Sequence, residues 1–269
     1  MKECAITPPL TDTESTFSLC MLASGSRGNA IYVSNGTTSV LIDAGLSGVE
    51  IERRLKSRGL RPENLDALIV SHEHADHLQG VGVLSRKYKL PVYMNADTQK
   101  AAYRLGKVNT AKSFTCSESF MINTLRIYPF PISHDAADPA GFTLEQGGVK
   151  IGIATDLGIA TALVKEHLKG CALLVLEANH DPEMLVQGPY PWPLKQRIQS
   201  RVGHLANADT HDLLRELQHD RLQHVVLAHL SETNNTPEKA YQAVSPALTR
   251  CLPKLCVATQ GVSSEILRV

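Results

Sequence analysis

The sequence contains no closely spaced cysteine pair of the CxxC type, although it holds six cysteines among its 269 residues. They are scattered along the chain, at Cys4, Cys20, Cys116, Cys171, Cys251 and Cys256. Reduced thiols in a cytoplasmic protein are the simplest interpretation of this pattern.

An excess of charge and a long apolar run are absent as well. Because 27 Lys and Arg balance 27 Asp and Glu, no global positive field draws the protein to nucleic acid, although a local basic patch remains compatible with this balance. No apolar run approaches the roughly 20 residues of a membrane span, and the first residues lack the apolar core of a signal peptide. We therefore expect a cytoplasmic protein without a membrane partner.

The composition that is present is ordinary for a globular protein, with 43% apolar and 20% charged residues. Residues 1–16 are polar and contain two prolines, which predicts a flexible N-terminal arm. No convincing linker follows, so we expect residues 17–269 to form a single domain. The sequence leaves the oligomeric state open.

Four potential metal ligands stand together in LDALIVSHEHADHLQG, residues 65–80. The apolar run 65–70 predicts a buried strand, and the spacing of the apolar residues within 78–88 predicts a helix. His72, His74, Asp76 and His77 lie between these elements. Side chains two apart in extended chain point to the same side, so His72 and His74 can hold one ion. Asp76 and His77 suit a second, and such ligands suit zinc, manganese or iron.

Further polar residues follow predicted strands elsewhere in the chain. Asp43 ends a predicted hairpin, His134 and Asp156 each follow a strand-like segment, and His229 follows the apolar run 224–228. Taken singly, Asp43 is equally a turn-forming aspartate and His134 a loop histidine.

The combined motifs resemble the metallo-β-lactamase superfamily of metal-dependent hydrolases, and within it the YycJ/VicX branch. The motifs that carry the resemblance are LASGSRGN, LIDAGLS, SHEHADH, SHDAADPAGF, TDLG, LEANHDPEML, GHLAN and AHLSETNN. Members of this branch are described as DNA exonucleases or, more loosely, as metal-dependent phosphodiesterases. The resemblance implies an α/β (α+β) protein, a four-layer αββα sandwich with two β-sheets face to face and helices outside.

Carried over by position, the resemblance implies a centre of two divalent ions, zinc or manganese and less readily iron. The first ion would be held by His72, His74, His134 and Asp156. The second would be held by Asp76, His77, Asp156 and His229, with Asp43 supporting the histidines from behind. A hydroxide bridging the ions would then attack the substrate, which also makes Asp76 a catalytic candidate.

Proton donation and substrate binding are predicted from the residues that are not ligands. His204 is the candidate proton donor for the leaving group, and His180 is its rival. Lys195, Arg197 and Arg201 form either a solvated helix face or a phosphate-binding group, and Asn235 is a further candidate for substrate contact. The basic residues favour a phosphodiester or DNA substrate. The alternatives are a carboxylic ester, thioester, lactone or lactam, and a non-enzymatic metal-dependent binding protein.

Overall fold

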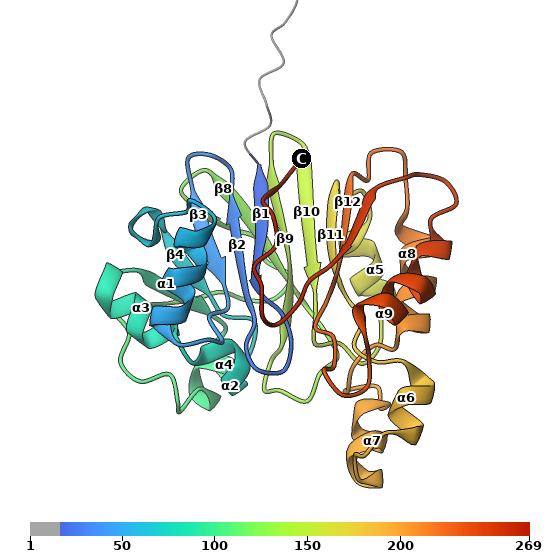
Figure 1. Cartoon of the computed structure of the whole chain (residues 1–269). Coiled ribbons are helices and arrows are strands. Elements are labelled where there is room, and N and C mark those ends of the chain that lie inside the picture. The colour runs from blue at the N-terminus through green and yellow to red at the C-terminus, as the bar shows by residue number, and fades with distance from the viewer. Residues whose placement is uncertain (1–16) are drawn as a thin grey trace, which may run out of the picture.

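The computed structural model describes residues 17–269. Two seven-stranded sheets lie face to face and helices cover their outer faces (Figure 1), which confirms the four-layer αββα sandwich. The predicted N-terminal arm and Cys4 lie outside the described residues. The cysteines within the described range are all free thiols.

The first sheet comes from the N-terminal half of the chain and one C-terminal strand, in the order β14-β1-β2-β3-β4-β5-β6. Neighbouring strands are antiparallel from β14 to β3 and parallel from β3 to β6. The bounds are β1 Ser18–Ala23, β2 Ala30–Ser34, β3 Ser39–Ile42, β4 Ala67–Ile69, β5 Pro91–Met94, β6 Thr110–Ser113 and β14 Leu267–Arg268.

The second sheet has the same mixture of pairings, in the order β13-β12-β11-β10-β9-β8-β7. Its strands are antiparallel from β7 to β10 and parallel from β10 to β13. The bounds are β7 Phe120–Ile122, β8 Leu125–Pro131, β9 Ala140–Gln146, β10 Val149–Ala154, β11 Leu173–Glu177, β12 His224–Ala228 and β13 Lys254–Val257.

Helices pack on both outer faces, and two of them extend beyond the sandwich. The bounds are α1 Gly48–Ser57, α2 Ala75–Leu78, α3 Val81–Tyr88, α4 Ala96–Ala101, α5 Ala162–Leu168, α6 Pro182–Gln187, α7 Trp192–Ile198, α8 Asn207–Leu217 and α9 Pro237–Val244, with short 3₁₀ turns at Pro62–Asn64 and Ser245–Ala247. Figure 1 shows α6 and α7 reaching away from one end of the sheets. Within residues 17–269, no helix is long and apolar enough to cross a membrane.

The core consists of three apolar layers, because most strands are covered on both faces. Strand β1 shows the principle: Leu19 and Met21 belong to the layer between the sheets, whereas Cys20 and Leu22 belong to the layer beneath α1 and α3. Successive side chains of a strand point to opposite faces. Burial of each large apolar side chain contributes about 1.5–3 kcal/mol, so both alternating sets stabilise the sandwich.

The helix predicted over 78–88 is present as α3, and its predicted first residue, Leu78, is the last residue of the short helix α2. Gly80 separates them, and its N–H donates to the carbonyl of Ala44 at 2.7 Å. A side chain at Gly80 would lie 2.5 Å from the carbonyl oxygen of Leu46. This close approach fixes α2 against the loop that follows β3, and it is a tertiary contact that apolar spacing does not reveal.

Candidate metal centre and active site

Three imidazoles converge at one edge of the sandwich, where strands of both sheets end. His72 and His74 follow β4, and His134 follows β8. The ring of His72 lies 4.6 Å from that of His74 and 5.1 Å from that of His134, centroid to centroid. The Nε2 atoms of His72 and His134 are buried and have no hydrogen-bond partner among residues 17–269. Since buried polar atoms are normally satisfied, these converging nitrogens fit a metal ion.

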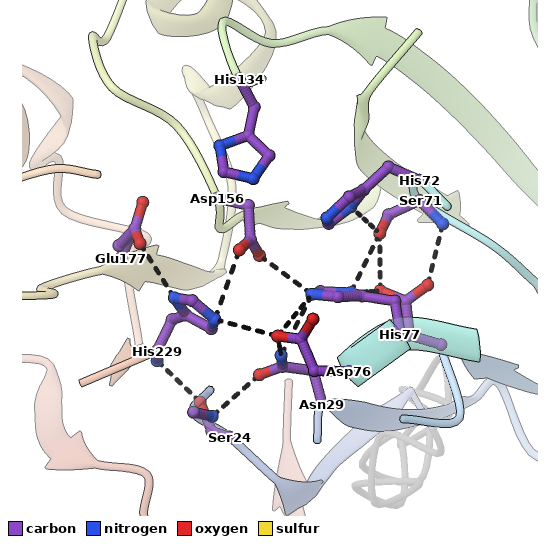
Figure 2. A network of polar contacts seen from close by, with 12 residues as sticks. Ser24, Asn29, Ser71, His72, Asp76, His77, His134, Asp156, Glu177 and His229 are labelled. Carbon is purple, nitrogen blue, oxygen red and sulfur yellow. Dashed lines mark hydrogen bonds and ion pairs between the residues drawn. The ribbon is translucent and has the colours of Figure 1, made fainter. Parts of the chain in front are cut away.

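A second group of ligand atoms lies beside the first and consists of Asp76, His77 and His229 (Figure 2). Oδ2 of Asp76 is 3.5 Å from Nε2 of His77 and 3.8 Å from Nε2 of His229. Burial raises the pKa of the Asp76 carboxyl, but the neighbouring imidazoles of His229 and His77 outweigh burial and hold that pKa far below its usual range. Asp76 is therefore ionised, as a metal ligand must be.

Asp156 lies between the two groups. Its Oδ1 is 3.3 Å from Nε2 of His229, and its Oδ2 is 3.5 Å from Nε2 of His77. Oδ2 is also buried, and it has no hydrogen-bond partner in the described part of the chain. One oxygen of this carboxylate lies within 4.8 Å of a ring nitrogen of His72 and of one of His77. A carboxylate has two oxygens and can serve two ions at once, so Asp156 occupies the position that a bridging ligand requires.

Asp43 holds His77 from behind, on the side away from these ligand atoms. Its Oδ2 accepts hydrogen bonds from Nδ1 of His77 and Oγ of Ser71, both at 2.7 Å, and its Oδ1 accepts from the Ser71 N–H at 2.8 Å. Burial lowers the pKa of His77, but the carboxylates of Asp43 and Asp156 outweigh burial and hold it well above its usual value. The bond to Asp43 leaves Nε2 of His77 directed at the ligand group.

Asn29 is a contact of the site that the sequence did not single out. Its Nδ2 lies 3.1 Å from Nε2 of His77 and 3.3 Å from Oδ2 of Asp76. The Asn29 N–H donates to the carbonyl of Asp76 at 2.8 Å, and a side chain at neighbouring Gly45 would lie 1.6 Å from that carbonyl oxygen. Asn29 belongs to SGSRGN, a segment whose glycines and small polar residues indicate a turn. Nothing in that motif indicates that the Asn29 side chain contacts His77 and Asp76.

Glu177 is a second residue of the site that the sequence motifs did not assign, and it lies at the end of the buried strand β11. Its Oε1 accepts from Nδ1 of His204 at 2.7 Å and Nδ1 of His229 at 3.0 Å, and its Oε2 accepts from the Leu157 N–H at 2.8 Å. Burial raises the pKa of Glu177, but the two histidines outweigh burial and hold it below its usual range. An acidic residue that ends a completely buried strand was the available signal.

His204 is placed next to the ligand histidines and remains open to solvent. Its ring stacks on that of His229 with centroids 5.2 Å apart, and it lies 5.1 Å from the ring of His134. Its side chain is 19% exposed, and it lines a cavity of about 170 Å³. The structure thus brings His204 to the ligand cluster, as a proton donor requires.

His180 is more deeply buried than His204. Its side chain is buried, its Nδ1 has no hydrogen-bond partner in the described chain, and its backbone pairs with Ala206 in an isolated β-bridge. It does not line the cavity of His204. Burial lowers the pKa of its imidazole, on which the charges of Glu177 and His204 also act, and a proton-donor role for His180 stays a prediction.

Lys195, expected to bind substrate, is instead a structural residue. Its Nζ donates to the carbonyl oxygens of Val186 at 2.7 Å and Gly188 at 2.8 Å, and its side chain is buried. These carbonyls belong to the C-terminal end of α6, where helix geometry leaves carbonyl groups without partners. Lys195 therefore fastens α7 to α6, a role that the basic spacing could not distinguish from phosphate binding.

The other three candidates for substrate contact are separated by the fold. Arg197 lines the cavity of His204 and pairs with Asp135, its Nε donating to Oδ2 at 2.6 Å. Arg201 lines a different cavity. Asn235 is buried, and its amide donates to the carbonyl oxygens of Ala178 at 2.9 Å and Asn179 at 3.1 Å. The Asn235 amide is already occupied, whereas substrate contact by Arg197 or Arg201 stays a prediction, and only Arg197 of the two lines the cavity of His204.

Comparison with known proteins places the chain among proteins of one superfamily. The family described as "Beta-lactamase superfamily domain" matches residues 38–230. The chain is 40% identical over 231 residues to exodeoxyribonuclease YycJ of Bacillus anthracis, covering 85% of this chain and 88% of that protein. It is 36% identical over 237 residues to exodeoxyribonuclease WalJ of Streptococcus pneumoniae, covering 86% and 88%.

A solved structure matches the fold over nearly the whole length. The metallo-β-lactamase fold protein YhfI of Bacillus subtilis aligns with a TM-score of 0.73 at 17% identity, covering 93% of this chain and 99% of that one. At this identity the match supports the sandwich architecture alone.

Proposed function

The chain belongs to the metallo-β-lactamase superfamily and is a metal-dependent hydrolase, and we propose that it is an exodeoxyribonuclease that hydrolyses phosphodiester bonds of DNA. The observation that carries the proposal is that all seven candidate metal ligands, from His72 to His229 in the sequence, lie together in a chain that is 40% identical to an exodeoxyribonuclease. Arg197 in the adjoining cavity supplies a cation for a phosphate.

The ligand roles follow from the two groups of atoms. His72, His74 and His134 would hold one ion, Asp76, His77 and His229 a second, and Asp156 would serve both. The orphaned nitrogens of His72, His134 and His229 and the orphaned oxygen of Asp156 fit such a pair. Two divalent ions, when bound, supply Lewis acidity and an activated water at neutral pH. Imidazole and carboxylate ligands suit zinc and manganese alike.

His204 would protonate the oxygen of the departing nucleotide. Its Nδ1 is bonded to Glu177, so that in the protonated ring Nε2 carries the proton available for transfer. After transfer the neutral ring keeps its Nδ1–H on Glu177, which fixes the tautomer and the ring plane. Glu177 is a positioning residue for both His204 and His229, because its Oε1 accepts a hydrogen bond from Nδ1 of each ring.

Arg197 would hold a phosphate oxygen at the cavity wall. Its present partner Asp135 directly follows His134, so the pair keeps the guanidinium beside the ligand cluster. Ser26 and Ser231 line the same cavity, and their hydroxyls can donate hydrogen bonds to a phosphate. The predicted phosphate-binding group thus reduces to one arginine and neutral polar neighbours.

A substrate panel combined with metal analysis tests the proposal. The protein would be assayed with zinc and with manganese on 5′-phosphorylated DNA, bis(p-nitrophenyl) phosphate, a thioester and a lactone, with ion content measured in parallel. We expect nucleotide release from DNA ends in a metal-dependent reaction. Activity on the thioester or lactone alone would overturn the proposal in favour of carbonyl hydrolysis. Full ion occupancy without any turnover would favour a binding protein.

A further inference from the structure

A second cavity lies on the Asp76 side of the ligand cluster, and none of the roles above uses it. It measures about 440 Å³, and its lining includes Asp76, Ser26, Arg27 and Arg104. The cavity of His204 is also lined by Ser26. The two cavities therefore meet at Ser26, with Asp76 on one side and His204 on the other, so a ligand crossing the cluster occupies both.

The second cavity carries two arginines that are available to an anion. Within residues 17–269, Arg104 has no carboxylate partner, and its guanidinium lies 5.5 Å from the ring centroid of Tyr103. Arg27 pairs with Glu232, and both side chains are largely exposed, at 70% and 47%. An exposed pair of this kind contributes little to stability, so a phosphate can replace Glu232 at little cost.

An exposed aromatic ring adjoins these cations. Tyr103 is 83% exposed and is the neighbour of Arg104 in the chain. Cations that follow a phosphate backbone, together with rings on which bases stack, are the combination found in proteins that bind single-stranded nucleic acid. Stacking needs a base whose face is free, which the interior of a duplex does not offer.

We propose that the second cavity binds the backbone of a single DNA strand next to the scissile bond, with Arg27 and Arg104 contacting phosphates and Tyr103 stacking on a base. This inference rests on the proposed function. The smaller cavity beside His204 receives the departing end, since the proton donor for the leaving oxygen lies there. The larger cavity then receives the strand on the other side of the bond.

The test measures KM and kcat of Arg104→Gln, Arg27→Gln and Tyr103→Ala on a 5′-phosphorylated single-stranded hexanucleotide at several salt concentrations. Arg126→Gln is the matched control, because Arg126 is exposed and lies near the start of β8, whereas His134 follows the end of that strand. Metal content and Tm of each variant confirm an intact fold.

We expect each arginine variant to raise KM about 5- to 10-fold and to leave kcat largely unchanged. The slope of log KM against log salt concentration should decrease by about 0.7, the value for one phosphate contact on a single strand. Tyr103→Ala should raise KM without changing that slope. The KM increases should be larger for the hexanucleotide than for a dinucleotide.

Unchanged KM and slope in both arginine variants would overturn the inference while leaving the exodeoxyribonuclease proposal standing. An equal loss in Arg126→Gln would also overturn it, because the effect would then come from net charge alone. A wild-type protein that cleaves a thioester but no DNA would overturn the proposed function itself.

Discussion

The two halves of the sandwich place an aspartate at the same point of their sheets and use it differently. Asp43 follows β3 and Asp156 follows β10, and each of these strands joins the antiparallel part of its sheet to the parallel part. Both residues have left-handed backbone conformations, with φ of 59° and 58°. Asp43 turns to His77 and Ser71, whereas Asp156 faces His77 and His229.

The halves also differ in how far their functional groups are spread along the chain. In the first half His72, His74 and His77 come from one loop and the start of one helix. In the second half His134, Asp156 and His229 follow three different strands, and Glu177, the last residue of β11, connects His229 to His204 between α7 and α8. The first half therefore supplies a motif that is compact in sequence, and the second half supplies single residues that only the assembled sheet brings together.

The largest effect is expected when the carboxylate of Asp156, which lies between the two groups of ligand atoms, is replaced by an amide. Asp156→Asn should lower bound metal from about two ions per chain and reduce turnover by about 1000-fold or more, since ions at such sites contribute several kcal/mol of charge stabilisation and about 1.36 kcal/mol corresponds to tenfold in rate. Elemental analysis and DNA cleavage measure the two effects. A variant that retained both ions and its rate would contradict a bridging role of Asp156.

His204 tests whether the second half adds a group beyond the ligands. His204→Ala should reduce kcat on DNA by about 100-fold, within the usual range for general acid catalysis, while ion content stays unchanged. The reduction should be much smaller on bis(p-nitrophenyl) phosphate, because p-nitrophenolate leaves without needing a proton. Equal losses on both substrates would contradict proton donation.

The supporting carboxylates sharpen the comparison at a smaller scale. Asp43→Asn and Glu177→Gln should each weaken metal binding about 10- to 100-fold, the usual effect of losing a partner of a ligand histidine. Excess metal should restore turnover of Asp43→Asn, which supports His77, but only part of that of Glu177→Gln, because Glu177 also orients His204. Metal titration of activity distinguishes the two, and equal recovery would refute the difference.

The smallest effect concerns how the first half is fastened to the C-terminal segment. Glu50 accepts hydrogen bonds from Arg53 and Arg54, which lower its pKa from 4.5 to about 2, and Arg54 also donates to the carbonyls of Leu22 and Gln260, both at 2.8 Å. Because the folded pKa is lowered, the stabilisation is complete above pH 4.5 and is lost as pH falls towards 2.

We expect Glu50→Gln to lower the free energy of unfolding at pH 7 by about 1 kcal/mol, since the pair is partly exposed and screened by solvent. The difference from the wild type should be largely lost at pH 2. Urea unfolding at the two pH values measures it, and a difference that persisted at low pH would rule out the ionised carboxylate as its source.

The sequence by itself determined the family and the order of the ligand residues. HxHxDH after an apolar run, followed by His134, Asp156 and His229 each at a strand end, was readable because β-strands and their ends leave a local pattern of apolar and polar residues. The sandwich followed from the resemblance that these motifs carry, and the structure confirms it.

Tertiary structure alone decided what the remaining polar side chains do. Lys195 and Arg197 lie two apart in one basic helix, yet Lys195 is buried on carbonyls of α6 and Arg197 lines the cavity. Glu177 acquires its role because residues 204 and 229 reach the end of β11 from distant parts of the chain. Charge and spacing along a sequence do not encode which neighbours a side chain meets, since those neighbours are set by the packing of the sheets.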